Sequence, residues 1–588
     1  MYYNVFGEKV SKRRFKEMCD AAKNRRELIA AGLTSRRDLL RMGLLTAGGM
    51  LVAKSGLSAR AYGQSGGGSN ISPGSFQNCI PGNQTQSPVT KPFIDPLPIM
   101  PLTRKVSSLS PTPTLNPNVG AGEVRAAAFQ APGIDSIRFP VVPSVLYNVH
   151  QRQFTTRQTS DTRLPAQTLW GFDDGSGTRS PGPTYQAFYG KPQLTRNTNS
   201  LPPTNQVNNT GFGMPQVSTH LHNAHNPSES DGNPCDFYPS GKFCDQYYPN
   251  VLAGFNSTNA PNGDVNEALS TLWYHDHRVD FTSQNTYKGL VGFYCLFNEF
   301  DTGNDDTGFR LPDFPAHDIP LAFADKIYDP TTGQLVFDLF NLDGILGDKF
   351  LVNGIIQPFL NVEPRRYRFR MLDTGPSRFY EFFLTDPKNP SQANPYWLIG
   401  TDGNLIPHPI QVQSVRIGPA ERVDVLIDFS KFAGKTIYLE NRLNQVNGQG
   451  PVAVDSQLFP QNSANTECAA NGAPLTNTGA ILPANSNNGA NLILQFRVSG
   501  SAVTDTSVDP ATNPTFYQLP STNVDPRIVR TFKFDRLNGQ WSINGQFMDC
   551  GYANGGTGGE STEKFRFTVQ QNSVEQWLLT NLTGDWTH

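Results

Sequence analysis

The sequence predicts an all-β protein built from several Greek-key β-sandwich domains. The chain has 588 residues, which is enough for three or four domains. Its 53 glycines and 46 prolines favour turns and disfavour long helices. Short strand-like runs recur between turn signals at the spacing typical of an all-β sandwich. A faint internal repeat indicates that the domains are related to one another.

The repeat consists of a glycine-bearing turn, an extended strand, a polar corner and an alternating strand that ends in Asn or Asp. Its three copies lie at residues 180–199, at 351–373, and at 542–549 together with 565–583. The repeat predicts one sandwich at 91–310, a second at 311–500 and a third from 501 to 588. We expect the third to be incomplete, because a two-sheet sandwich normally uses ~100 residues or more.

Residues 1–61 predict an N-terminal extension followed by an export signal. The pair Arg36-Arg37 precedes an apolar run from Leu39 to Val52, and Ala59-Arg60-Ala61 resembles a signal cleavage site. This order is typical of a twin-arginine signal, which predicts a periplasmic or secreted protein with the twin-arginine machinery as its export partner. The alternative is an N-terminal membrane anchor.

Composition excludes several other functions. Residues 62–90 are rich in Gly, Ser, Pro and Gln and predict a linker. The chain after the leader has no apolar stretch of 18 residues, so we expect no transmembrane helix. A net charge of -2 does not favour nucleic-acid binding. The sequence also contains no phosphate-binding loop and no nucleophile elbow.

The cysteines fit an exported chain. Cleavage after the signal would remove Cys19 and leave six of the seven cysteines, an even number that permits disulfides. Cys235 and Cys244 lie in one loop and are candidates for a pair. Cys295 lies in an apolar run and is expected to be a buried thiol.

Two histidine pairs about fifty residues apart carry the strongest functional signal. They are His220-Leu221-His222 and His275-Asp276-His277. Alternate side chains of a strand point to the same face, so each pair places two imidazoles together. Two such strands facing one another would gather four imidazoles, which suits a borderline metal ion such as copper. The isolated histidines are expected to be surface or hydrogen-bonded residues: His150, His317 and His408.

Both stretches resemble the first two copper motifs of the multicopper oxidases, closest to the bacterial spore-coat laccase and bilirubin oxidase branch. The resemblance implies that His220 binds the type 2 copper. It implies that the paired type 3 coppers are bound by His222, His275 and His277. Asn223 stands where the family usually has glycine.

The segment following the first pair adds two residues, each of which has two possible roles. SESDGNP is similar to the family's Ser-Asp-Gly run, so the resemblance makes Asp231 a catalytic proton source beside the copper cluster. The alternative for Asp231 is a turn-capping role. His225 is either a loop histidine or a residue that orients a ligand.

The likeness continues along most of the chain, over roughly residues 90 to 588. Residues 347–380 resemble the entry to the family's second cupredoxin domain. Residues 399–430 do so too, with a Pro-Ala-Glu-Arg turn at Pro419 to Arg422. The resemblance therefore implies tandem cupredoxin-like domains.

The chain ends at NLTGDWTH, where the family's third copper motif begins. By resemblance His588 is the first histidine of that motif and a type 1 copper ligand. None of the seven cysteines is flanked by histidines, so the type 1 Cys is missing. We therefore expect this chain to be a fragment of a longer enzyme, with a partial copper cluster at best.

The complete enzyme is expected to be an exported multicopper oxidase with type 1, type 2 and type 3 copper. It would couple one-electron oxidation of phenolic, bilirubin-like or metal-ion donors to four-electron reduction of dioxygen to water. Its partners would be dioxygen and a small-molecule donor. The alternative is a short, non-oxidising copper-binding or structural cupredoxin protein.

Overall fold

The structure is a computed structural model in which most of the region after residue 86 is described. It describes residues 2–5, 8–11, 87–88, 90–114, 117–124, 143–203, 212–251, 270–329, 331–337, 345–388, 393–445, 453–454, 492–517, 526–537, 540–546, 567–570 and 573–582. The predicted export signal, all but three residues of the predicted linker, and His588 lie outside the described residues.

Two sheets form a first sandwich. One sheet has the order β11-β7-β4-β3, with β5 paired to β4, and the other has the order β6-β13-β12-β9. The strands of the first sheet are β3 (Lys105–Val106), β4 (Val145–Thr156), β5 (Gln167–Asp173), β7 (Gln193–Asn199) and β11 (Phe243–Tyr248). Those of the second sheet are β6 (Tyr185–Phe188), β9 (Thr219–His222), β12 (Thr271–Asp276) and β13 (Val291–Phe297).

The sequences of the inner strands explain why they form the middle of this sandwich. β13 reads VGFYCLF and is buried at every position, as expected for a strand covered on both faces. β12 reads TLWYHD and is also buried throughout. Aromatic side chains from both sheets meet between them, among them Tyr147, Phe172 and Tyr274. The polar residues of β12 are therefore held inside the protein by its aromatic neighbours.

Two larger sheets form a second sandwich. Their orders are β17-β16-β14-β19-β25-β22-β23, with β15 on β14, and β18-β29-β26-β20-β21, with β24 on β20. The strands of the first of these sheets are β14 (Asp318–Tyr328), β15 (Leu335–Val336), β16 (Lys349–Val352), β17 (Ile355–Ile356), β19 (Arg366–Asp373), β22 (Tyr396–Thr401), β23 (Asn404–Val412) and β25 (Arg422–Asp428). Those of the other are β18 (Phe359–Val362), β20 (Tyr380–Thr385), β21 (Ala393–Asn394), β24 (Ser414–Ile417), β26 (Thr436–Asn441) and β29 (Leu492–Val498).

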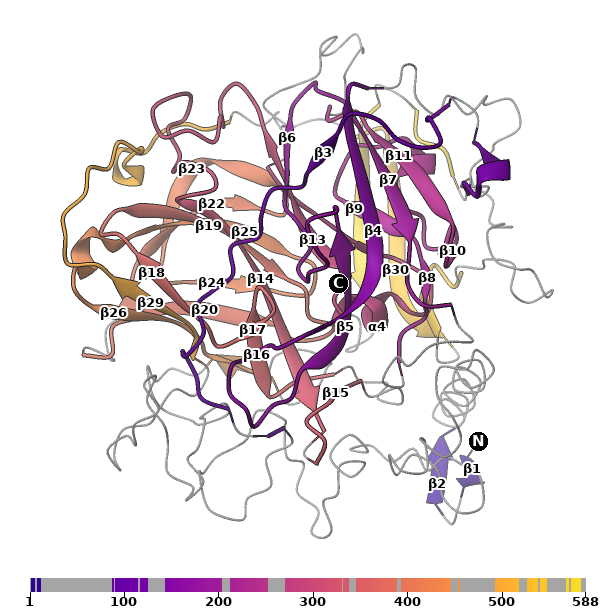
Figure 1. The fold of residues 1–588 in the computed structure, drawn as a ribbon, viewed down its shortest axis with the longest axis horizontal. Coiled ribbons are helices and arrows are strands. Elements are labelled where there is room, and N and C mark those ends of the chain that lie inside the picture. Colours follow the sequence, from indigo (N-terminus) through magenta and orange to yellow (C-terminus); the bar gives the residue numbers. More distant parts are fainter. Residues whose placement is uncertain are drawn as a thin grey trace.

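The core of the second sandwich is apolar, and its edge contributes to the first. Phe323, Phe369 and Phe496 are fully buried between its two sheets. Ile399 and Leu426, from β22 and β25, instead pack into the aromatic core of the first sandwich. Figure 1 shows the two sandwiches beside one another, the first in purple and magenta and the second in orange. The two sandwiches thus share a packed boundary.

The remaining elements are short. A third sheet has the order β31-β30-β32, from β30 (Ile528–Leu537), β31 (Gln540–Ile543) and β32 (Glu575–Asn581). Small pairs are β1 (Tyr2–Val5) with β2 (Glu8–Ser11), β8 (Gln216–Val217) with β10 (Tyr238–Pro239), and β27 (Leu443–Asn444) with β28 (Ala453–Val454). The helical elements are α4 (Thr282–Tyr287) and the 3-10 turns η1 (Val119–Ala121), η4 (Ser228–Ser230), η6 (Phe429–Phe432) and η7 (Pro510–Thr512).

This mostly β architecture confirms the predicted fold class. Parallel pairs such as β4 with β7 and β14 with β19 alternate with antiparallel ones, so each sandwich contains crossover connections rather than hairpins alone. The predicted domain boundaries at 310 and 500 stay predictions. Within the part of the chain that the structure describes, no helix has the length and apolar character needed to cross a membrane.

Candidate metal centre

Pairing between β9 and β12 brings the two histidine pairs together. The strands are antiparallel, with His220 opposite His275 and His222 opposite Trp273. Because side chains alternate, His220, His222 and His275 lie on one face. His277 follows the end of β12, and its backbone N–H donates to Ser218 O at 2.7 Å. Its ring centroid lies 5.2 Å from those of both His220 and His275.

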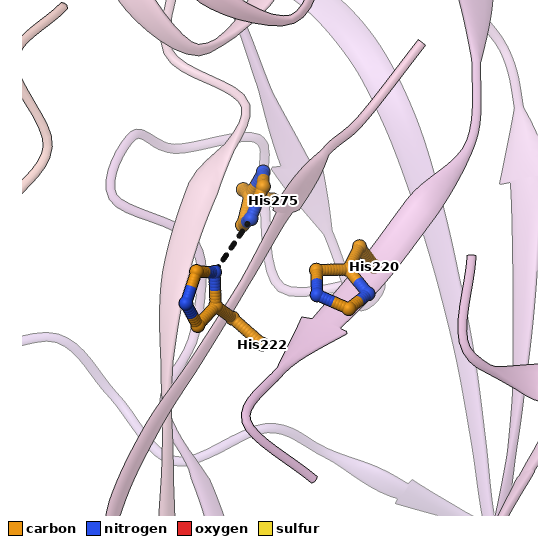
Figure 2. A group of neighbouring side chains, drawn as sticks. All are labelled: His220, His222 and His275. Carbon is orange, nitrogen blue, oxygen red and sulfur yellow. Dashed lines mark hydrogen bonds between the residues drawn. The ribbon is translucent and has the colours of Figure 1, made fainter. Parts of the chain in front are cut away.

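Three of these histidines converge closely enough to share a metal. One ring nitrogen from each of His220, His222 and His275 lies within 4.8 Å of the others. His222 Nδ1 and His275 Nε2 are 3.3 Å apart and share a hydrogen bond. Figure 2 shows those two imidazoles facing one another, with His220 beside them. The ring nitrogens of three imidazoles therefore converge, with the His277 ring beside them. The role of each histidine as a copper ligand stays a prediction.

Neighbouring carbonyl groups fix the tautomers of two ligands. His220 Nδ1 donates to Asp231 O at 2.5 Å, and His275 Nδ1 donates to Asp276 O at 2.8 Å. A proton on Nδ1 leaves a lone pair on Nε2, as is usual for metal-binding histidines. In His275 this lone pair accepts the hydrogen bond from His222 Nδ1, a bond that a metal ion would replace. The donor set thus fits a copper ion, for which imidazole nitrogen is a common ligand.

Burial keeps the cluster in its neutral form. Burial lowers the pKa of His275 well below its usual value, and the neighbouring imidazoles lower it further. Burial also lowers the pKa of His220, although its hydrogen bond to Asp231 opposes the change. Because only neutral imidazole binds a metal, these shifts favour a metal-binding state at neutral pH.

Asp276 holds both histidine pairs in place. Its carboxylate accepts hydrogen bonds from Ser218 N at 2.9 Å, Asn285 Nδ2 at 2.8 Å and Arg278 N at 3.2 Å. Ser218 lies just before β9, so one buried side chain from the second pair fixes the strand that carries the first. Burial raises the pKa of Asp276 to about 7. No pattern in the sequence assigned this role to Asp276. Its position between two candidate metal-binding histidines could have indicated it.

A glycine turn presses Asp231 against His220. Gly232 has φ +80, and an added Cβ there would lie 2.1 Å from Thr219 O, so only glycine fits. Asp231 Oδ2 consequently lies 3.6 Å from His220 Nδ1. Burial raises the pKa of the Asp231 carboxyl to about 6. The carboxyl therefore lies beside the cluster, with a pKa above that of an ordinary aspartate.

Three other histidines of the described residues hydrogen-bond to groups outside this cluster, as predicted. His150 Nδ1 hydrogen-bonds with Ser200 Oγ at 2.9 Å. His408 Nδ1 donates to Pro514 O at 3.2 Å. His317 is bound between Asp313 and Glu363. His225 is exposed and is not one of the three histidines whose ring nitrogens converge.

The cysteines correct one expectation. Cys235 is disulfide-bonded, but Cys244 is a thiol, so the suggested pairing of these two residues is wrong. Cys244 lies on β11, opposite Asn197 of β7, and its position is set by that ladder rather than by its nearness in sequence. Cys295 is a buried thiol, as predicted, and burial raises its pKa to about 12.

The chain is similar in sequence to known copper oxidases. The chain is 30% identical to a bilirubin oxidase of Albifimbria verrucaria over 446 residues, covering 75% of this chain and 63% of that protein. It is 33% identical to a laccase of Bacillus stratosphericus over 308 residues, covering 47% of this chain and 54% of that laccase. No family model matches. The chain belongs to the multicopper oxidase family.

Solved structures support the fold. A multi-copper oxidase from Pediococcus acidilactici matches with a TM-score of 0.54 at 17% identity, covering 85% of this chain and 77% of that one. The 2F4 variant of the McoA multicopper oxidase from Aquifex aeolicus matches with a TM-score of 0.51 at 21% identity, covering 68% of this chain and 71% of that one. The chain thus spans less than two thirds of the length of either curated relative. It spans 71% and 77% of the chains in the two solved structures.

Proposed function

We propose that this chain is the copper-binding part of a laccase-like or bilirubin-oxidase-like multicopper oxidase. The observation that carries the proposal is the convergence of His220, His222 and His275 on facing strands, within 4.8 Å of one another. Copper bound there would supply the one-electron chemistry by which dioxygen is reduced to water at the expense of a small-molecule donor. Family membership supports the same assignment.

The side chains of the cluster would divide the work of holding copper. By resemblance, His220 serves a type 2 ion, whereas His222, His275 and His277 serve a type 3 pair. The hydrogen bonds from Nδ1 of His220 and His275 would orient the two rings so that Nε2 could hold the ion. The strong burial of His275 and β12 excludes water from one side of the cluster.

Asp231 would hold and deliver protons for the reduction of dioxygen. Its carboxyl has a pKa raised to about 6 and lies beside the His220 ring. A general acid works best when its pKa is near the working pH. Its side chain is 42% exposed, so it can regain a proton from solvent after releasing one.

A second candidate is a copper-binding protein without oxidase activity. The observation that favours it is that none of the seven cysteines has the histidine neighbours of a type 1 site. Blue copper needs a Cys thiolate with two imidazoles. The type 1 role of His588 stays a prediction, as does continuation of the chain beyond that residue. Sequencing the gene past codon 588 tests both.

Copper loading of the full chain tests the proposal. We expect the wild-type protein to bind copper, and His275→Ala to lose most of it because a buried ligand is removed. His408→Ala is the control, since the His408 side chain hydrogen-bonds to the carbonyl of Pro514, away from the histidine cluster. Copper per chain is measured by elemental analysis, and type 2 character by paramagnetic resonance. Equal copper contents in the wild type and His275→Ala would refute the site.

Oxygen uptake separates the two candidate functions. Copper-loaded protein is mixed with a phenol, with bilirubin or with a reduced metal ion, and dioxygen consumption is followed. Uptake that depends on His275 and on a donor supports the oxidase. If the gene continues past codon 588, the assay uses its full product. Stoichiometric copper in that product, with neither dioxygen uptake nor a blue thiolate-copper band, supports the second candidate.

We also propose export by the twin-arginine route. The support is sequence alone, since residues 34–61 lie outside the described residues. Replacing Arg36 and Arg37 with lysine should trap the protein in the cytoplasm, because that route reads the arginine pair. Cell fractionation measures the outcome, and export unaffected by the change would contradict the proposal.

A further inference from the structure

Arg422 of the second sandwich contacts both strands that carry the histidine pairs. Its Nε donates to Thr271 O at 3.2 Å, at the start of β12. Its Nη2 donates to Asn223 Oδ1 at 3.1 Å, directly after His222 at the end of β9. One side chain from β25 therefore joins the ends of the two ligand-bearing strands.

The guanidinium of Arg422 is held mainly by uncharged oxygens. Its Nη1 donates to Ala420 O at 2.8 Å, and its Nη2 also donates to Asp402 O. The carboxylate of Asp402 lies 3.3 Å away but is 58% exposed, whereas the Arg422 side chain is 2% exposed. Burial lowers the pKa of Arg422 to about 10, although Asp402, Asp424 and Glu421 oppose this. A buried charge without an equally buried partner is unfavourable, so stability alone does not explain this residue.

Asn223 occupies a backbone conformation that few residues tolerate. Its φ is +74, in the left-handed region that asparagine and glycine adopt most easily. The chain turns sharply there, with Ala224 N donating to Leu221 O at 3.4 Å. The amide oxygen of Asn223 meets Arg422 on the outside of this turn. The direction in which the chain leaves His222 is therefore tied to the second sandwich.

The distances within the cluster are sensitive to such a tie. His222 Nδ1 and His275 Nε2 are only 3.3 Å apart, and they come from the two strands that Arg422 bridges. A metal site needs its ligands within about 0.5 Å of their working positions. A shift of β9 against β12 would move His222 away from His275.

We propose that Arg422 is a positioning residue of the metal centre: it holds the turn that follows His222 against the start of β12 by binding Asn223 and Thr271. The inference rests on the proposed copper site. It has a thermodynamic consequence, since coupling between two events is reciprocal. Docking of the second sandwich strengthens copper binding, and copper binding strengthens that docking.

Two variants of the full chain test this role. Asn223→Gly removes the amide but keeps a residue that adopts φ +74 without strain, so it isolates the bond to Arg422. Arg422→Met removes the guanidinium. Copper affinity is measured by competition with a chromophoric chelator, and the resonance spectrum of bound cupric ion reports ligand geometry. We expect Arg422→Met to weaken binding by about 10- to 100-fold and Asn223→Gly by roughly 10-fold or less, as for other groups that orient metal ligands.

A double variant and a matched control make the result specific. Asn223→Gly should have little further effect in the Arg422→Met background, because both changes remove the same bond. Arg378→Met is the control: Arg378 is a buried arginine of the same sandwich that bonds to Asp325 and Gly347 O, away from β9 and β12. It should lower the Tm of the copper-free protein yet leave copper affinity and the spectrum unchanged.

The possible outcomes separate this inference from the proposed function. Loss of affinity in both variants, with a changed spectrum and a smaller copper-induced rise in Tm, supports it. Wild-type affinity in Asn223→Gly and Arg422→Met overturns it while leaving the copper site intact. An equal loss in Arg378→Met also overturns it, because the effect would then be general destabilisation. A wild-type protein that binds no copper refutes the proposed function and, with it, this role of Arg422.

Discussion

Two groups of arginines join the second sandwich to strand β12, and they differ in how their charge is balanced. Arg368 and Arg370, both on β19, are fully buried among the buried carboxylates of Asp301, Asp318 and Asp424. These carboxylates raise the pKa of both arginines despite their burial. Arg422 is similarly buried, but burial lowers its pKa to about 10.

Both Arg370 and Arg422 contact Thr271, the first residue of β12. Arg370 Nη1 donates to Thr271 Oγ1 at 2.9 Å and to Ser270 O at 3.2 Å. Arg422 Nε donates to Thr271 O, and its Nη2 donates to Asn223 Oδ1. The network of Arg368 and Arg370 with buried carboxylates thus stabilises the boundary between the sandwiches. Arg422, whose one directly bonded carboxylate is exposed, extends the attachment to the turn that follows His222.

The largest predicted effect is that of Arg370→Met. The change leaves Asp318 buried without the bidentate partner whose Nε and Nη2 lie 2.8 and 2.7 Å from its oxygens. Removing one member of a buried ion pair costs about 3–5 kcal/mol of unfolding free energy. Denaturant unfolding of the copper-free protein measures this loss of unfolding free energy. A loss below about 1 kcal/mol would show that the network does not stabilise the boundary between the sandwiches.

Arg422→Met should destabilise the copper-free protein less. It removes hydrogen bonds to carbonyl groups, each worth about 1 kcal/mol, but also relieves a poorly paired buried charge. We expect a loss of about 1–2 kcal/mol in the same unfolding measurement. If the loss equals that of Arg370→Met, the distinction between the two groups of arginines fails.

Lys326 extends the comparison from arginines to a buried lysine at the boundary. Its Nζ donates to Tyr287 O, and burial lowers its pKa to about 7. Between pH 7 and the ordinary lysine value near 10.5 the unfolded chain holds a proton that the folded chain has released. Stability should therefore rise with pH in this window, by at most about 1.4 kcal/mol per pH unit from this group.

Lys326→Met is the measurement that isolates this contribution. Unfolding free energies of the variant and the wild type are compared at pH 7 and pH 9, so that other titrating groups cancel. The variant should show a smaller rise with pH. Identical pH profiles would mean that Lys326 stays charged in the folded protein.

The smallest predicted effect belongs to an exposed arginine. Arg416 lies 2.6 Å from Glu381, but its side chain is 49% exposed. Exposed pairs contribute about 0–1 kcal/mol, so Arg416→Met should change the unfolding free energy by less than about 1 kcal/mol. A larger loss would indicate that the burial of an arginine does not determine how much it contributes to the unfolding free energy of this protein.

Much of the fold and of the cluster could be predicted from sequence. The β-rich architecture followed from turn residues and short strand-like runs, and the four histidines from their alternate spacing. The residues that hold the histidine-bearing strands in place were harder to predict. Asp276 and Asn285 belong to no periodic sequence pattern. Their roles depend on how helix α4, strand β12 and the residue before β9 pack together. The suggested Cys235–Cys244 pair failed for a related reason, since nearness in sequence does not determine which side chains face one another.

The sequence by itself determined that each histidine pair presents two imidazoles to one face, because the repeat of a strand is a property of the local backbone. Only the tertiary structure decided that His220 lies opposite His275, since strand register depends on the packing of the whole sheet. The bond from Arg422 to Asn223 spans 199 residues of sequence and crosses the boundary between two sandwiches. Such a contact depends on how two separately formed cores dock, which no local pattern records.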